Sequence, residues 1–148
     1  MILRVIHPLF KLDLQDKGLT LIEENSWFID KFFAKYTYPF DFEITDELYL
    51  KTADYEANVF PLLRGEYDFV MDNFTPPPMA PPEEQQTWSH PRGSDLLVWA
   101  NACGNSPVIV SDIGDSPLAY DDENFRRLVE NSLRWLASDE AKQWAKRR

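Results

Sequence analysis

The sequence is poor in the residues that usually form disulfides and metal sites. It contains one cysteine, Cys103, and two histidines, His7 and His90, in 148 residues. A single cysteine cannot form an internal disulfide, which fits a reducing cytoplasm. The histidines are not spaced as a helical His-x-x-x-His pair, and no Cys-x-x-Cys is present, so a zinc site has little support. We therefore expect a cytoplasmic protein without a metal or another cofactor.

Long apolar runs, a glycine-rich phosphate loop and an excess of positive charge are also missing. No apolar run approaches the ~20 residues that a membrane-spanning helix needs. The formal net charge is -10, and a polyanion such as a nucleic acid or an anionic membrane surface would repel such a chain. We expect neither nucleic acid nor membrane among the partners.

The composition is that of an ordinary globular protein. Hydrophobic residues make up 44% of the chain and aromatic residues 14%. Both fractions are higher than those typical of disordered proteins. A chain of this length buries about two thirds of its unfolded surface. We expect a single domain spanning 1–148.

The C-terminal third carries the clearest pattern. A nearly continuous apolar run, Leu96–Ala100, is followed by the turn signal Gly104–Pro107 and by a second run, Val108–Val110. Runs without alternation predict strands buried on both faces, which is typical of α/β sheets covered by helices. Beyond them the spacing predicts a helix after an Asp121 N-cap. Its predicted buried face comprises Phe125, Leu128, Val129, Ser132, Leu133 and Leu136. Its predicted solvent face comprises Arg126, Arg127, Glu130, Asn131 and Arg134.

The remaining elements are predicted from shorter patterns. Apolar and polar residues alternate from Phe40 to Thr45, which indicates a half-exposed strand. A Ser N-cap with acid in the first turn and base in the last predicts a helix over Ser138–Arg148. Further predicted elements are strands at Ile2–Ile6, Val59–Leu63 and Tyr67–Met71, and a helix at Glu23–Lys35.

A proline-rich loop is predicted over 73–93. Five prolines fall within 76–82, and proline donates no backbone hydrogen bond, so we expect neither helix nor central strand there. Polyproline II is expected in part of it. Two interpretations stay open. The loop is either a surface excursion without consequence or a pocket edge that places Trp88 and His90 beside a ligand.

Carboxylates follow two of the predicted strands. Asp46 and Glu47 end one strand, and Asp112 and Asp115 follow another. In α/β sheets ligands bind at the carboxyl ends of strands, where these side chains would converge. Carboxylates that accept sugar hydroxyls, beside an aromatic ring that stacks on the sugar, make a carbohydrate site. Helix capping and turn formation are the alternative roles of these acids.

The motifs also resemble a known family. His7-Pro8 with Gly18-Leu19, then Phe42-Glu43-Ile44-Thr45-Asp46-Glu47-Leu48-Tyr49, and the strand-loop-helix tail are similar in order and spacing to ThuA-like proteins, the trehalose-utilisation family. The resemblance implies a flavodoxin-like α/β fold, related to class I glutamine amidotransferases, and a link to carbohydrate metabolism. It covers the C-terminal half of such a domain only, so the sheet would be truncated on its N-terminal side. We therefore expect a homo-oligomer or a partner chain that supplies the missing half.

The resemblance points to Glu47 and Tyr49 as the best single candidates for the site. If the protein is an enzyme, Asp46 or Glu47 would act as general acid or base, with Asp115 or His7 as partner. The binding candidates are His7, Tyr49, Trp88, His90 and Asp112. Such proteins usually carry Gly-His where this chain has Gly114-Asp115, and a carboxylate cannot replace an imidazole as a switch near neutral pH. The rival function is a non-catalytic interaction module that binds through its acidic face or an exposed sheet edge.

Overall fold

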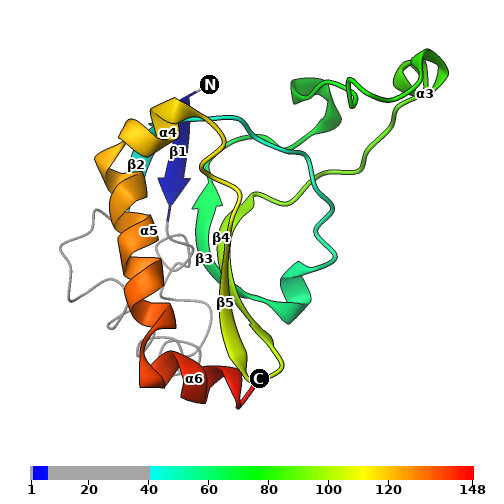
Figure 1. Cartoon of the computed structure of the whole chain (residues 1–148). Helices are drawn as coiled ribbons and strands as arrows, with labels where there is room; N and C mark the ends of the chain where they lie inside the picture. Colours follow the sequence, from blue (N-terminus) through cyan, green and yellow to red (C-terminus); the bar gives the residue numbers. More distant parts are fainter. Residues whose placement is uncertain (1, 7–40) are drawn as a thin grey trace, which may run out of the picture.

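The structure is a computed structural model that describes residues 2–6 and 41–148. The described strands form one five-stranded sheet in the order β2-β1-β3-β4-β5, with α4, α5 and α6 along one side (Figure 1). The strands are β1 (Ile2–Ile6), β2 (Asp41–Thr45), β3 (Phe60–Gly65), β4 (Leu96–Cys103) and β5 (Ser106–Ser111). The helices are α3 (Pro82–Gln86), α4 (Pro117–Asp121), α5 (Glu123–Leu136) and α6 (Asp139–Ala145), with short 3-10 turns η2 (Glu56–Asn58) and η3 (Met71–Asn73).

Every pair of neighbouring described strands is antiparallel, whereas the flavodoxin-like fold that the resemblance implies has a parallel sheet. The mixture of helices and sheet is confirmed, and β4 and β5 form a hairpin across the predicted turn. The apolar run in β4 has a different cause, since this inner strand is covered on both faces. Trp99 packs on Tyr55, with ring centroids 4.9 Å apart, while Ala100 faces the opposite way and joins the core with Trp135.

The β4–β5 hairpin turns at Gly104-Asn105, because Cys103 pairs directly with Ser106. Gly104 has φ +59, and Asn105 does not have a positive φ. A glycine with positive φ at the first central position is the type II′ pattern, which matches the twist of the flanking strands. The predicted turn is thus confirmed, and it is shorter than the sequence signal suggested.

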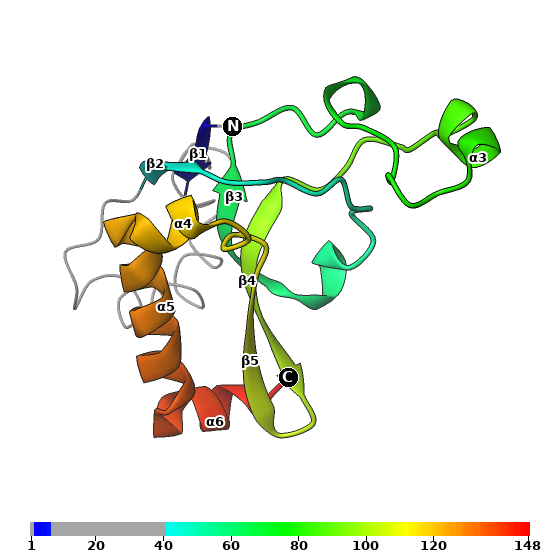
Figure 2. The same cartoon turned by 45° about the horizontal axis from the view of Figure 1, so that its top comes forward.

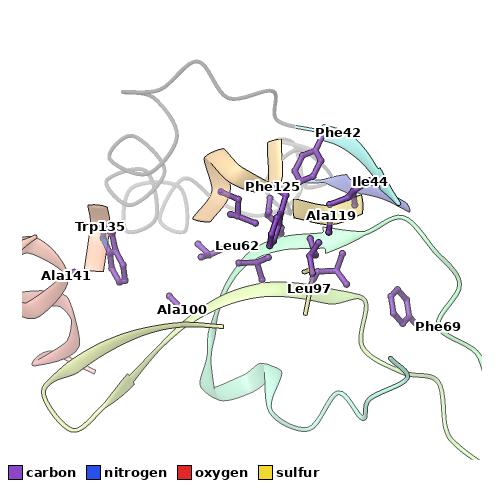
Figure 3. Close-up of a cluster of buried hydrophobic side chains, with 14 residues drawn as sticks. Phe42, Ile44, Leu62, Phe69, Leu97, Ala100, Ala119, Phe125, Trp135 and Ala141 are labelled. Atoms are coloured by element: carbon purple, nitrogen blue, oxygen red, sulfur yellow. The ribbon is translucent and has the colours of Figure 1, made fainter. Parts of the chain in front are cut away.

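The core lies between the sheet and α4 to α6 (Figure 3). The predicted β2 alternation is confirmed, since Phe42 and Ile44 are buried and Glu43 is exposed. The labelled core side chains of Figure 3 are Phe42, Ile44, Leu62, Phe69, Leu97, Ala100, Ala119, Phe125, Trp135 and Ala141.

The predicted orientation of α5 is wrong in part. Phe125 and Leu128 are buried as expected, but Leu133 is 62% exposed and Asn131 only 6%. The buried face also includes Trp135, so it is rotated from the predicted one. The N-cap is Asp122 rather than Asp121, because the Asp122 carboxylate accepts from the amides of Asn124 and Phe125.

The remaining predictions have mixed outcomes. β1 and α6 are confirmed, with Ser138 as the N-cap of α6. The strand predicted at Tyr67–Met71 is wrong, since no strand forms there. The proline-rich loop contains the short helix α3, contrary to expectation. Its first residue is Pro82, a position where the missing N–H costs nothing. The helix predicted at Glu23–Lys35 lies outside the described residues.

Candidate functional site

A groove of about 540 Å³ lies between the segment that follows β2 and the proline-rich loop. In both views of the molecule this loop, which carries α3, projects away from α5 (Figures 1 and 2). The volume falls within the range of small-molecule sites. The described lining residues are Glu47, Leu48, Tyr49, Leu50, Phe74, Thr75, Pro77, Pro78, Trp88 and His90. Four residues predicted from the sequence, Glu47, Tyr49, Trp88 and His90, therefore share one groove.

Backbone contacts join the end of the proline-rich loop to the segment after β2 and to the segment before the loop. The amide of Ser94 donates to the carbonyl of Lys51 at 2.9 Å, and the amide of Gly93 donates to the carbonyl of Phe69 at 2.7 Å. A Cβ atom at Gly93 would lie 2.5 Å from Leu50 Cδ1. Glycine at this position therefore lets the end of the proline-rich loop approach Leu50 closely.

Trp88 and His90 present rings from one wall. Their ring centroids are 6.4 Å apart, with the planes tilted by 36°. His90 Nδ1 lies 2.7 Å from the carbonyl oxygen of Pro91. Because a carbonyl only accepts hydrogen bonds, Nδ1 carries the proton and Nε2 is the acceptor nitrogen of the neutral ring. The wall thus combines an aromatic surface with a group that can accept or transfer a proton.

Tyr49 lies on the other wall among carboxylates. It is 48% exposed, and its hydroxyl lies 3.4 Å from Glu47 Oε2. Partial loss of water raises the pKa of the Tyr49 phenol, and the carboxylates of Asp115 and Glu47 raise it further. Asp115 comes from the loop after β5, so two separate chain segments place negative charge around one hydroxyl.

Asp46 joins those two segments. Its side chain is buried, with 4% of the residue exposed. Oδ2 accepts from the amide of Gly114 at 2.6 Å, and Oδ1 accepts from the amide of Ser116 at 3.2 Å. Gly114 has φ +118, and a Cβ there would lie 2.6 Å from the Phe125 ring. The expected proximity of the two acidic loops is therefore seen, and Asp46 serves as the link between them.

Asp112 lies apart from the described lining of the groove, in an ion pair with Lys51. Lys51 Nζ also donates to the carbonyl of Leu96 at 3.2 Å and lies 5.0 Å from the Trp99 ring centroid. Burial lowers the pKa of the Lys51 ammonium to about 8, and Glu56 opposes this shift. The contact with Asp112 acts in the same direction as Glu56, because a neighbouring carboxylate favours the charged amine.

A polar network that the sequence did not suggest supports the segment between Lys51 and β3. Arg64 pairs with Asp95 and with Glu56, whose Oε2 lies 2.5 Å from Nη2. The hydroxyl of buried Ser94 donates to Glu56 Oε1 at 2.6 Å and lies 3.0 Å from the hydroxyl of Tyr55. The partners are up to 39 residues apart in sequence, so no local pattern could have revealed them.

A second hollow of about 440 Å³ lies between β2 and α4. Its described lining is Glu43, Ile44, Thr45, Leu118, Asp121 and Asp122. Asp122 is already engaged as the N-cap of α5. Among the residues that the structure describes, no three His, Cys, Asp or Glu residues form a group that could hold a metal ion. In the same part of the chain, no helix combines the length and apolarity that crossing a membrane requires.

Together these features define a mixed α/β protein with an antiparallel sheet and an aromatic, acidic groove. No protein-family model matches the chain, and searches of curated proteins and of solved structures found no match either. The resemblance to ThuA-like proteins therefore rests on the sequence motifs, and it stays a prediction. The candidate His7 lies outside the described residues.

Proposed function

We propose that this protein binds a carbohydrate in the groove between Tyr49 and Trp88. The observation that carries the proposal is the lining itself, where Tyr49 and Trp88 lie with Glu47 and His90 around about 540 Å³. Aromatic rings stack on the apolar faces of pyranoses, and carboxylate and imidazole groups bond to their hydroxyls. A cytoplasmic location belongs to the proposal and is supported by the single cysteine.

The finer form of this proposal is a ThuA-like role in the utilisation of trehalose or a related sugar. Its support is the motif that ends in Asp46-Glu47-Leu48-Tyr49, because Glu47 and Tyr49 line the groove. A flavodoxin-like or class I glutamine amidotransferase-like relationship would require parallel strands beyond those described. That relationship rests on the motifs alone.

If the bound sugar is transformed, Glu47 is the best placed acid or base. It is exposed, lines the groove and lies beside the Tyr49 hydroxyl. The carboxylate of Asp115 also raises the pKa of the Tyr49 phenol, and Asp115 would serve as the partner of Glu47. Asp46 fits this role less well, because both of its oxygens already accept backbone amides. We therefore assign Asp46 to positioning the two loops.

Calorimetric titration with trehalose and a panel of other di- and oligosaccharides tests sugar binding. Trp88→Ala should lower the affinity for the sugar at least about tenfold, because the sugar can no longer stack on the indole ring. Met79→Ala is the matched control. Met79 belongs to the same loop and is 94% exposed, but it is not among the described lining residues.

The control variant should bind as tightly as the parent protein. No heat with any sugar in the panel would overturn the proposal, and so would equal losses in the two variants.

A second candidate function is self-association through α5. Val129 and Leu133 are four residues apart on this helix, and both are exposed. Apolar side chains at such a spacing form one exposed stripe, which a second copy of the chain could cover. Light scattering at micromolar concentration tests this candidate. A dimer that dissociates on Leu133→Asp supports it, and a monodisperse monomer contradicts it.

A further inference from the structure

We propose that the groove selects a cationic sugar, a pyranose with a protonated amino group, over the neutral sugar of the same shape. This inference rests on the proposed carbohydrate function and names the substrate class. The ammonium group would lie beside the Tyr49 hydroxyl, between the carboxylates of Glu47 and Asp115. The apolar face of the ring would lie against Trp88.

The charges around Tyr49 support a cation rather than a neutral hydroxyl. The Tyr49 hydroxyl lies 3.4 Å from Glu47 Oε2, and both residues line the groove. Asp115 is not in the described lining, but its carboxylate acts on the same phenol and, like Glu47, raises the pKa of Tyr49. Two carboxylates that disfavour a further negative charge at one point favour a positive charge there for the same reason. The phenol can still accept a hydrogen bond from an ammonium group while it donates to one carboxylate.

The described basic residues that adjoin the lining in sequence are paired with other acids. The described lining contains no lysine or arginine. Lys51 follows the lining residue Leu50 in sequence, but it is held by Asp112. Arg92 follows Trp88 and His90 in sequence, and its Nη1 lies 2.8 Å from Asp68 Oδ1.

The aromatic residues act in the same direction. The faces of tryptophan and tyrosine rings attract cations as well as sugar C–H groups. The overall charge of -10 steers cationic ligands toward the molecule. An exposed acidic surface alone would attract any cation. A groove with a stacking ring instead selects a cation that also carries an apolar face.

The test compares three ligands on the full chain by calorimetry or NMR titration at about pH 7. Glucosamine carries the charge, glucose lacks it, and N-acetylglucosamine keeps the nitrogen without the charge. Glucosamine should bind at least about fivefold more tightly than glucose, because an ion pair at a partly desolvated site adds to the stacking. The preference should shrink at high salt, since partly exposed charges are screened.

Two charge-removing variants separate the local effect from the overall charge. Glu47→Gln should lower the affinity for glucosamine at least about fivefold more than the affinity for glucose, because only glucosamine loses an ion pair. Glu140→Gln removes the same charge from an exposed position on α6 and should leave the preference intact.

Equal affinity for glucosamine and glucose would overturn this inference and leave the proposed function standing. N-acetylglucosamine binding as tightly as glucosamine would overturn it as well, because the charge would then be irrelevant. If neither these three sugars nor any sugar of the di- and oligosaccharide panel binds, the proposed function itself is overturned.

Discussion

Asp46 was predicted from its position at a strand end, where catalytic carboxylates often lie. The structure shows why position alone does not define a role, because both oxygens of this carboxylate accept amides of the Gly114–Ser116 loop. No sequence pattern records that a partner 68 residues away needs an acceptor. The neighbouring Glu47 has the same chemistry but lies exposed in the groove.

Asp46→Ala should destabilise the fold by about 2–4 kcal/mol, because two amides lose a charged acceptor in a buried place. Glu47→Ala is the matched control and should change stability by no more than about 0.5 kcal/mol. Urea denaturation monitored by tryptophan fluorescence measures both free energies of unfolding. Similar values for the two variants would contradict the assignment of Asp46 as the link between the loops.

Lys51 gives the molecule a pH dependence whose sign follows from its burial. Its pKa is lowered to about 8 in the folded protein, from the ordinary value of 10.5. Between these values the unfolded chain binds a proton that the folded protein does not, so the free energy of unfolding rises with pH. The full cost of the buried charge is present below about pH 8, and it disappears as the pH approaches 10.5.

We therefore expect the free energy of unfolding of the parent protein to rise, relative to that of Lys51→Met, by on the order of 1 kcal/mol as the pH increases from about 8 to 10.5. The whole shift in the pKa of Lys51 corresponds to a larger free energy, but the side chain is partly exposed and Asp112 favours its charged form. Lys142→Met, on the exposed surface of α6, is the control and should show no such change. Chemical denaturation at a series of pH values measures the difference. A flat difference for Lys51→Met would refute the role given to burial.

At the scale of elements, α5 shows what periodicity can and cannot determine. The helix itself and the burial of Phe125 are as the spacing predicts. Ion pairs between Glu123 and Arg127 and between Glu130 and Arg134 lie on its surface. The orientation was misjudged because two apolar stripes adjoin each other on this helix. Trp135, rather than Leu133, packs into the core, where its ring centroid lies 5.5 Å from that of Trp144. The sheet and α6 select the stripe, and α5 alone does not contain that information.

Leu128→Ala should cost about 2–5 kcal/mol, because it removes a large side chain from the buried face of α5. Leu133→Ala should cost less than about 1 kcal/mol, because Leu133 is exposed and alanine favours the helix. Thermal unfolding followed by circular dichroism compares the two variants. An equal or larger loss for Leu133→Ala would mean that the exposed stripe is covered in solution, as in self-association through α5.

The polar and aromatic residues of the candidate groove were easier to predict than its apolar lining. Residue types that bind sugars identified Glu47, Tyr49, Trp88 and His90, and the groove contains all four. Phe74 and Leu50 were missed because they read as ordinary core residues. The proline-rich loop was the sequence feature that indicated one wall of the groove, because long loops on the surface often carry binding residues.

At the scale of the whole molecule, strand direction was the main error. A continuous apolar strand is typical of parallel sheets, yet β4 acquires this pattern by lying inside an antiparallel sheet covered on both faces. The burial of a strand determines its apolar pattern, and that pattern does not depend on whether the neighbouring strands are parallel or antiparallel. The pairing of β1 with both β2 and β3 also joins segments that are far apart in the chain, which local patterns do not encode.

The antiparallel register explains the position of Pro107 in the edge strand β5. Asp112 donates its amide to the carbonyl of Leu97, and Cys103 pairs with Ser106 across the turn. Since hydrogen-bonded pairs alternate along an antiparallel ladder, Ser106, Val108 and Val110 face β4 through their backbone groups. Pro107 therefore falls at an outward position, where its missing N–H takes nothing from the sheet and removes a donor from the open edge.

Pro107→Val should restore that donor and raise β-propensity, so that copies of the chain associate more readily through β5. Ser106→Val is the matched control, because it adds the same side chain at the adjacent position, whose backbone groups already bond to β4. Light scattering across a concentration series should show a rising apparent mass for Pro107→Val and little change for Ser106→Val. If both variants associate equally, added hydrophobicity rather than the restored donor is responsible. If neither does, the edge of β5 is protected by something other than its proline.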